Sequence, residues 1–93
     1  MEQLPRIVWT EYLRYRAQLR GLDFVEIERI LRFGEERYMD TATGRLIVVG
    51  RHHGMLVMVP YETDDESVTP VTIHTTTRQQ INIRIQTERF RHA

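Results

Sequence analysis

The sequence predicts an α+β domain in which an antiparallel four-stranded sheet, a β-meander, is joined by two N-terminal helices and one C-terminal helix. Two helix-capping patterns stand in the first third of the chain, and β-rich runs separated by glycine-containing turns follow them. Because the strands are mainly consecutive, helices on one face of the sheet are favoured over a doubly wound fold. At 93 residues, one domain covering residues 1–93 is expected.

Two N-terminal helices follow from the capping residues. Thr10 stands at the N-cap position before EYLRYRAQLR, and Gly21 ends that segment. Asp23 begins a capping-box pattern, and apolar residues then recur at helical spacing over residues 24–33, with Gly34 as the C-cap. A short β-prone run, IVW, precedes the first helix and predicts a short strand.

Three β-rich runs, ERYMD, RLIVVGRH and MLVMVPYE, are separated by the turns TATG and HG, which have hairpin spacing. After an acidic loop, VTPVTIH predicts a further sheet strand. The last segment, TTTRQQINIRIQTERF, is ambiguous: Ile81, Ile83 and Ile85 alternate as in a strand, whereas its polar residues suit a capped helix. We predict a helix there.

The composition of the chain excludes several kinds of site and of partner. The chain has no Cys, which excludes disulfides, a thiol nucleophile and thiolate zinc sites, and it has no segment of about 20 apolar residues that could span a membrane. We therefore expect a cytoplasmic protein. Thirteen Arg and no Lys balance thirteen acids, so the net charge is zero, which counts against strong autonomous binding of nucleic acid. From His74 onward four Arg face one Glu, so a local basic face is expected.

Most catalytic classes lack support. The four His match no metal motif, so neither a metal nor another cofactor is expected; GRHHG lacks the following helix of a phosphate cradle, and the single Ser has no indicated base. General acid–base chemistry at an RNA phosphodiester remains, because His, Tyr, Glu and Arg suffice for it. In that hypothesis two arginines hold the phosphate, an imidazole moves protons and a tyrosine stacks on a base; the residues are Arg51 and Arg78, then His52, His53 or His74, and Tyr12 or Tyr61.

Each of these residues also has a purely structural interpretation. Arg16 and Arg20 lie at i, i+4 spacing beside tyrosines and either contact RNA or form a solvated helix face. His74 ends a strand and either serves the site or is a half-exposed sheet residue. Arg78 opens a predicted helix, where the helix dipole favours acids, and this mismatch makes it the first candidate.

Four short stretches together resemble the BrnT branch of the RelE-like toxin superfamily: IVWTE at Ile7–Glu11, RGLDF at Arg20–Phe24, GRLIVVGRHHG at Gly44–Gly54 and VTPVTIHTTTRQQ at Val68–Gln80. The resemblance implies a compact sheet with two N-terminal helices and a ribonuclease that cuts messenger RNA. It also implies a ribbon-helix-helix antitoxin as partner. Carried over by position, the toxin-like contacts fall on Arg51, Arg78 and Glu11. The chain departs from these toxins in its lack of Lys and its zero net charge.

The second hypothesis is a non-enzymatic domain that binds another protein or forms a homodimer. Its support is the zero net charge and the small number of acid–base groups. A neighbouring reading frame for a ribbon-helix-helix protein would favour the toxin hypothesis, and a lone gene would favour the interaction domain.

Overall fold

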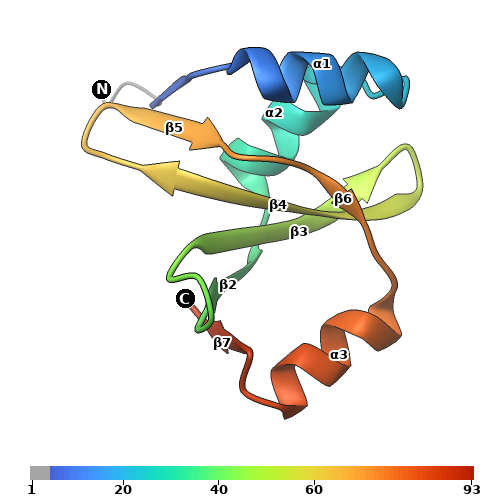
Figure 1. Cartoon of the computed structure of the whole chain (residues 1–93), viewed down its shortest axis with the longest axis vertical. Coiled ribbons are helices and arrows are strands. Elements are labelled where there is room, and N and C mark those ends of the chain that lie inside the picture. Colours follow the sequence, from blue (N-terminus) through green and yellow to red (C-terminus); the bar gives the residue numbers. More distant parts are fainter. Residues whose placement is uncertain (1–4) are drawn as a thin grey trace.

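The structure is a computed structural model that describes residues 5–93. Within these residues, three helices and seven strands follow one another (Figure 1). In order they are β1 (Arg6–Ile7), α1 (Glu11–Leu19), α2 (Phe24–Phe33), β2 (Glu36–Asp40), β3 (Leu46–His52), β4 (Met55–Thr63), β5 (Ser67–Pro70), β6 (His74–Thr75), α3 (Arg78–Gln86) and β7 (Phe90–His92).

The predicted helices and their N-caps are confirmed. The Thr10 hydroxyl accepts a hydrogen bond from the Leu13 backbone N–H at 3.1 Å, which satisfies one of the free donors at the start of α1. At the start of α2, a carboxylate oxygen of Asp23 accepts a hydrogen bond from the Val25 backbone N–H at 2.9 Å. The ambiguous last segment is helical over Arg78–Gln86 and starts with a capping box at Thr77.

The two predicted hairpins are also present. β2 pairs with β3, and β3 with β4, both antiparallel. His53 and Gly54 join β3 to β4 and have φ angles of 49° and 85°, the pair of positive values that a two-residue type I′ turn requires.

The expected four-stranded antiparallel sheet is wrong in size and type. The sheet has seven strands in the order β1-β5-β4-β3-β2-β7, with β6 also on β4, and β1 pairs with β5 in parallel. The predicted strand VTPVTIH is divided into β5 and β6, which pair with different parts of β4. Strands of two or three residues, such as β1 and β7, are too short to show alternation, so only tertiary pairing defines them.

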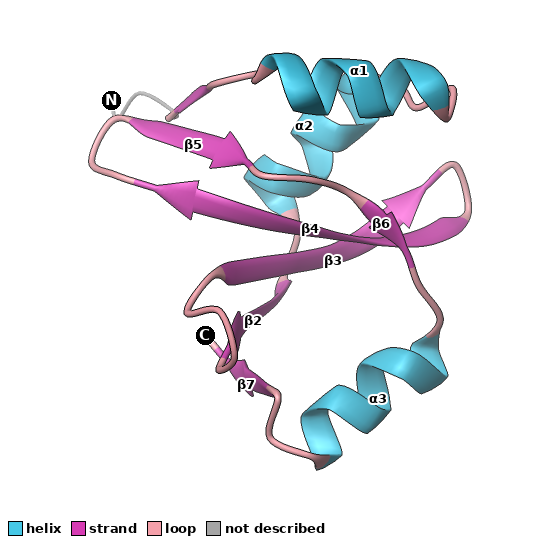
Figure 2. Cartoon of the chain, viewed as in Figure 1, coloured by secondary structure: helices cyan, strands magenta, loops and turns pink. Residues whose placement is uncertain are grey.

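The placement of all helices on one face is corrected as well, because each face of the sheet carries its own core (Figure 2). Helices α1 and α2 pack on one face around Leu13, Ile30 and Val59. Helix α3 packs on the other face through Ile81, which belongs to the same buried cluster as Phe90. None of the helices in residues 5–93 is long and apolar enough to cross a membrane.

Candidate anion-binding site

Two residues predicted for the site, 58 positions apart in sequence, meet at the β6 edge of the sheet. Arg16 of α1 donates from Nε to the Ile73 carbonyl oxygen at 3.1 Å, and its Nη2 lies 3.3 Å from Nδ1 of His74. A guanidinium group can only donate, so Nδ1 of His74 accepts and the proton of the neutral imidazole is assigned to Nε2. Both Arg16 and His74 therefore present hydrogen-bond donors.

The surroundings of His74 keep its imidazole neutral. Burial lowers the pKa of His74 below its ordinary 6.5, and the positive charges of Arg16, Arg20 and Arg84 lower that pKa further. Among residues 5–93, none of these three arginines is paired with a carboxylate within 4.0 Å. We call Arg16, Arg20, His74 and Arg84 the arginine cluster. It is a local excess of positive charge in a chain whose net charge is zero.

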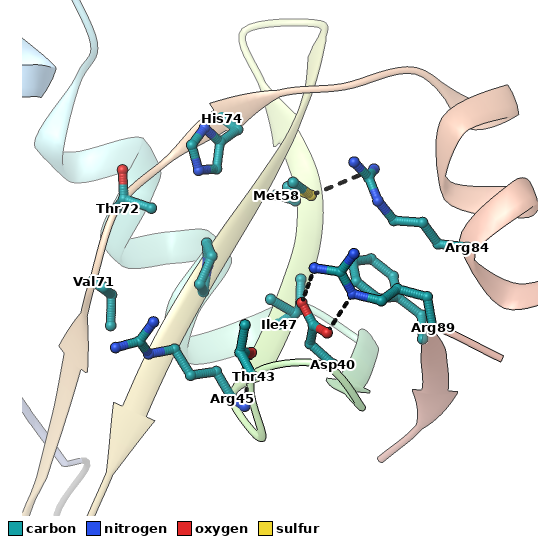
Figure 3. A pocket seen from close by; sticks show the side chains of 12 residues that line it. Asp40, Thr43, Arg45, Ile47, Met58, Val71, Thr72, His74, Arg84 and Arg89 are labelled. Carbon is teal, nitrogen blue, oxygen red and sulfur yellow. Dashed lines mark hydrogen bonds and ion pairs between the residues drawn. The ribbon is translucent and has the colours of Figure 1, made fainter. Parts of the chain in front are cut away.

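A cavity of about 220 Å³ adjoins the arginine cluster (Figure 3). Its walls come from the β2–β3 turn, from residues 71–74 beside β4, and from α3 with the residues that lead into β7. The lining residues are Asp40, Thr43, Arg45, Ile47, Met58, Pro60, Val71, Thr72, His74, Arg84, Arg89 and Phe90. His74 and Arg84 thus belong to both the cluster and the cavity.

Arg89 is held in place in this cavity by Asp40. Its Nε and Nη2 donate to the two carboxylate oxygens at 2.6 and 3.0 Å, and only 5% of the Asp40 surface is exposed. The Arg89 hydrogen bond lowers the pKa of Asp40 more than burial raises it, so the carboxylate is ionised near neutral pH. Arg89 uses two of its five N–H donors on Asp40, and three remain for another acceptor.

Arg84 is supported by apolar groups instead of a carboxylate. Its guanidinium carbon lies 5.5 Å from the centre of the Phe90 ring, and Nη1 lies 4.0 Å from the sulfur of Met58. Figure 3 shows Arg84 and Arg89 on the same side of the cavity, across from His74. A cation–π contact of this kind leaves the N–H groups at the edge of the guanidinium free to donate.

Arg78, the first candidate from the sequence, is engaged elsewhere. Its Nη1 and Nη2 donate to the two carboxylate oxygens of Glu36 at 2.5 and 2.9 Å, which ties the start of α3 to β2. Tyr38 donates its hydroxyl to Glu36 at 2.6 Å, and burial together with that carboxylate raises the pKa of Tyr38 to about 12. The mismatch between Arg78 and the helix dipole is thus offset by a specific carboxylate.

Arg51 and His52 stand at the β3–β4 hairpin and contact neighbouring backbone groups. Nε2 of the buried His52 accepts from the Asp23 backbone N–H at 2.8 Å, at the start of α2. Arg51 is exposed and donates to the Gly54 carbonyl oxygen at 3.1 Å. Neither side chain lines the cavity beside His74.

The remaining predicted residues divide between surface and core. Glu11 and Tyr12 are exposed on α1, Tyr12 with 56% of its surface, and Arg20 is exposed at the C-cap of that helix. Tyr61 is buried, and its hydroxyl accepts from Nη1 of Arg37 at 3.0 Å, so its ring has no free face for a base.

Sequence reasoning did not select Arg45, Arg84, Arg89 or Asp40 for the site. The excess of Arg after His74 was the only signal that pointed to part of this group. In residues 5–93 there is no group of three or more His, Asp or Glu side chains that could hold a metal ion. Comparison with protein-family models, curated proteins and solved structures gives no match, so the resemblance to RelE-like toxins stays a prediction.

Proposed function

We propose that the protein is a toxin-like, RNA-acting domain that holds RNA phosphates at the arginine cluster. The observation that carries this proposal is the gathering of Arg16, Arg20 and Arg84 around the neutral His74, with no carboxylate pairing to any of the three within the described residues. Fixed guanidinium groups with unused donors favour anions with several acceptor oxygens, and the phosphate of RNA is such an anion.

Helix α1 extends this surface in a way that suits single-stranded RNA. Tyr12, Arg16 and Arg20 are spaced by four residues and so share one side of the helix. Tyr12 and its neighbour Tyr15 expose 56% and 64% of their surfaces. Exposed aromatic rings beside arginines stack on bases while the arginines contact the backbone, an arrangement that accepts single strands of varied sequence.

For RNA cleavage, His74 is the imidazole placed beside the cluster. In the reaction the 2′-oxygen attacks phosphorus, a base takes the 2′-proton, and an acid protonates the leaving 5′-oxygen. A neutral His74 has a lone pair to serve as the base, but that lone pair faces Arg16, so the substrate must displace this contact. Arg16 and Arg84 would then stabilise the charge that develops on the phosphate oxygens.

The direct test is binding of a fluorescein-labelled single-stranded RNA, measured by fluorescence anisotropy. The double variant Arg16→Gln plus Arg84→Gln is compared with a control, Arg29→Gln plus Arg91→Gln, that removes the same charge outside the cluster. Each lost charged hydrogen bond costs about 1.5–3 kcal/mol, so affinity should fall roughly a hundred-fold or more in the cluster variant. The salt dependence should weaken by roughly 0.7 per lost contact on a logarithmic plot. Equal losses in the two variants would contradict the proposal.

Cleavage is tested separately, by expressing the protein in bacteria and following growth and total RNA. Arrest with RNA loss in the wild type, and neither in a folded His74→Ala variant, is the expected result. Binding without cleavage by purified protein, with and without ribosomes, would leave RNA binding as the function and remove the nuclease step.

A second candidate, the interaction domain, is supported by exposed apolar side chains on the helices of one face. Leu19 on α1 and Val25 and Phe33 on α2 expose 70%, 75% and 64% of their surfaces. Exposed apolar side chains that gather in one patch mark contact with a protein, so these three residues are the ones through which an antitoxin or a second copy of the chain would bind. Size-exclusion chromatography with light scattering, before and after Leu19→Glu and Phe33→Glu, measures self-association: a monomer at all concentrations would argue against the homodimer.

A further inference from the structure

The cavity beside His74 combines a charged rim with an apolar floor. Three arginines line it, from the β2–β3 turn, from α3 and from the position before β7, and we call them its rim (Figure 3). Five apolar residues also line the cavity, and we call them its apolar floor: Ile47, Met58, Pro60, Val71 and Phe90. The proposed RNA contacts use only His74 and Arg84 of the cavity lining, so the rest of the lining is available to a further ligand group.

We propose that the cavity binds the phosphomonoester group of a nucleotide, with the nucleoside lying against the apolar floor. The same chemistry is offered by a free nucleoside monophosphate and by the phosphorylated end of an RNA chain. If the ligand is an RNA end, this inference rests on the proposed function. If the ligand is a free nucleoside monophosphate, the inference is independent of that function.

Charge and donors favour a phosphomonoester. The charged residues of the lining are Arg45, Arg84, Arg89 and Asp40, so the lining carries two net positive charges, which match a dianion better than the single charge of a phosphodiester. The groups that rim the cavity supply donors on several sides: three guanidinium groups, and Nε2–H of His74 in its assigned tautomer. A terminal phosphate has three free oxygens to accept from several directions, and a carboxylate has two in one plane.

The three arginines at the rim retain N–H groups that can donate hydrogen bonds to such a ligand. Asp40 takes two N–H groups of Arg89 and leaves three. Arg45 is tied to Glu62 by one contact of 3.4 Å between exposed side chains, which is weak and easily exchanged. Arg84 has no carboxylate partner among residues 5–93 and is steadied by the Phe90 ring.

The apolar floor and the size of the cavity indicate what is attached to the phosphate. A volume of about 220 Å³ lies below the roughly 300 Å³ at which pockets for drug-sized molecules begin, so it holds a phosphate and part of a nucleoside. Met58 and Pro60 are half-buried and offer apolar surface to a flat ring, and Arg84 can stack on the opposite side of that ring. A sugar with a phosphate alone would leave this apolar surface uncovered.

The test is titration of the full chain at low salt with uridine and adenosine monophosphates, inorganic phosphate and uridine, by isothermal calorimetry. Both monophosphates should bind, phosphate should bind more weakly, and uridine should not bind measurably. Arg84→Gln keeps the first three carbons of the side chain but removes the guanidinium over Phe90, and it should weaken monophosphate binding roughly ten- to hundred-fold. The control Arg91→Gln lies in β7 and outside the lining, and it should change the affinity less than about two-fold.

Loss of structure is checked by circular dichroism, and if Arg84→Gln is unfolded, Arg45→Gln replaces it, because Arg45 is exposed and has only the weak Glu62 contact. No binding of either monophosphate, equal binding of uridine, or the same loss in Arg84→Gln and Arg91→Gln would overturn the proposal.

The two sources of the phosphate are separated with short RNAs that carry a 5′-phosphate, a 3′-phosphate or hydroxyl ends. Tighter binding of one phosphorylated RNA, lost in Arg84→Gln and competed by free monophosphate, assigns the cavity to that RNA end. Monophosphate binding that depends on Arg84, together with no binding of any RNA, supports the cavity as a nucleotide site and refutes the proposed RNA function alone.

Discussion

The ion pair between Arg78 and Glu36 gives a quantitative test of whether Arg78 serves the fold or the site. The variants are Arg78→Gln, Glu36→Gln and the double variant, compared in a double-mutant cycle. The Arg78 side chain is 49% exposed and that of Glu36 is 28% exposed, so the pair lies between a fully solvated and a buried ion pair. Exposed pairs contribute about 0.2–1 kcal/mol, and the bidentate geometry places this one near the upper end, at about 1 kcal/mol of coupling.

The free energy of unfolding is measured by urea denaturation and the midpoint of thermal unfolding by circular dichroism. For a chain of this size a loss of 1 kcal/mol lowers the midpoint by about 4–8 °C. The hydrogen bond from Arg78 lowers the pKa of Glu36 from its ordinary 4.5 more than burial raises it. A depressed carboxyl pKa gives stability that is present above the ordinary pKa and is lost as pH falls through the folded-state pKa. The difference between wild type and Arg78→Gln should therefore be constant near neutral pH and shrink below 4.5.

RNA binding is then measured on the same variants at a temperature where all are folded. We expect Arg78→Gln to bind RNA as the wild type does, since Arg78 belongs neither to the arginine cluster nor to the cavity lining. A coupling energy near zero, combined with a large loss of RNA binding or cleavage in Arg78→Gln, would refute the structural role and restore Arg78 as a functional residue.

Three further predictions concern other parts of the fold. At pH 7, above the second pKa of about 6 of a phosphomonoester, monophosphate binding should take up a proton, because a bound anion raises the depressed pKa of His74; calorimetry in buffers of different ionisation enthalpy measures that uptake, which should be lost in His74→Ala. Gly34→Ala should destabilise the protein by about 1–3 kcal/mol in urea, because its Cβ would lie 2.6 Å from the backbone oxygen of Ile30 and 2.7 Å from Cγ2 of Val48. His53→Gly should stabilise the protein by up to about 1 kcal/mol and so raise the thermal midpoint slightly, because the φ of 49° at that position is strained for His and ordinary for Gly. An unchanged or lower midpoint would show that the contact of His53 with Asp23 outweighs the strain.

Local signals in the sequence predicted the elements that depend on local physics. The N-caps Thr10 and Asp23, and the turn at His53 and Gly54, are decided by hydrogen bonds and φ angles within a few residues. Gly34 was predicted as a C-cap and lies there, but its φ of −63° is ordinary. Its small size matters because Ile30 and Val48 leave no room for a side chain, and no local pattern shows that.

The elements that sequence reasoning missed depend on contacts between distant residues. The parallel pair of β1 and β5 joins Arg6 to Ser67, and β7 is defined by three residues that pair with β2. The alternation of Ile81, Ile83 and Ile85 reads equally as strand or helix until α3 is packed, when Ile81 is buried and Ile83 is half exposed. The second core, and with it the cavity between α3 and the sheet, was therefore beyond prediction from the pattern alone.

The candidate site shows why a net charge of zero was a poor guide to anion binding. Most carboxylates that pair with arginine do so away from the arginine cluster, in the pairs Arg29–Glu26, Arg32–Glu28, Arg45–Glu62 and Arg78–Glu36, with Arg89–Asp40 inside the cavity. Three further acids, Asp64, Asp65 and Glu66, follow Glu62 just after the end of β4.

The acids thus neutralise the whole chain without neutralising the cluster, since exposed charges farther apart than the Debye length of about 8 Å are largely screened from one another at physiological salt. Three arginines contacting a single strand predict a salt slope of roughly −2, which is shallow beside that of strongly basic proteins. The affinity of the site should accordingly depend on the geometry of a few donors around His74 more than on the total charge, and it should respond steeply to the loss of any one of them.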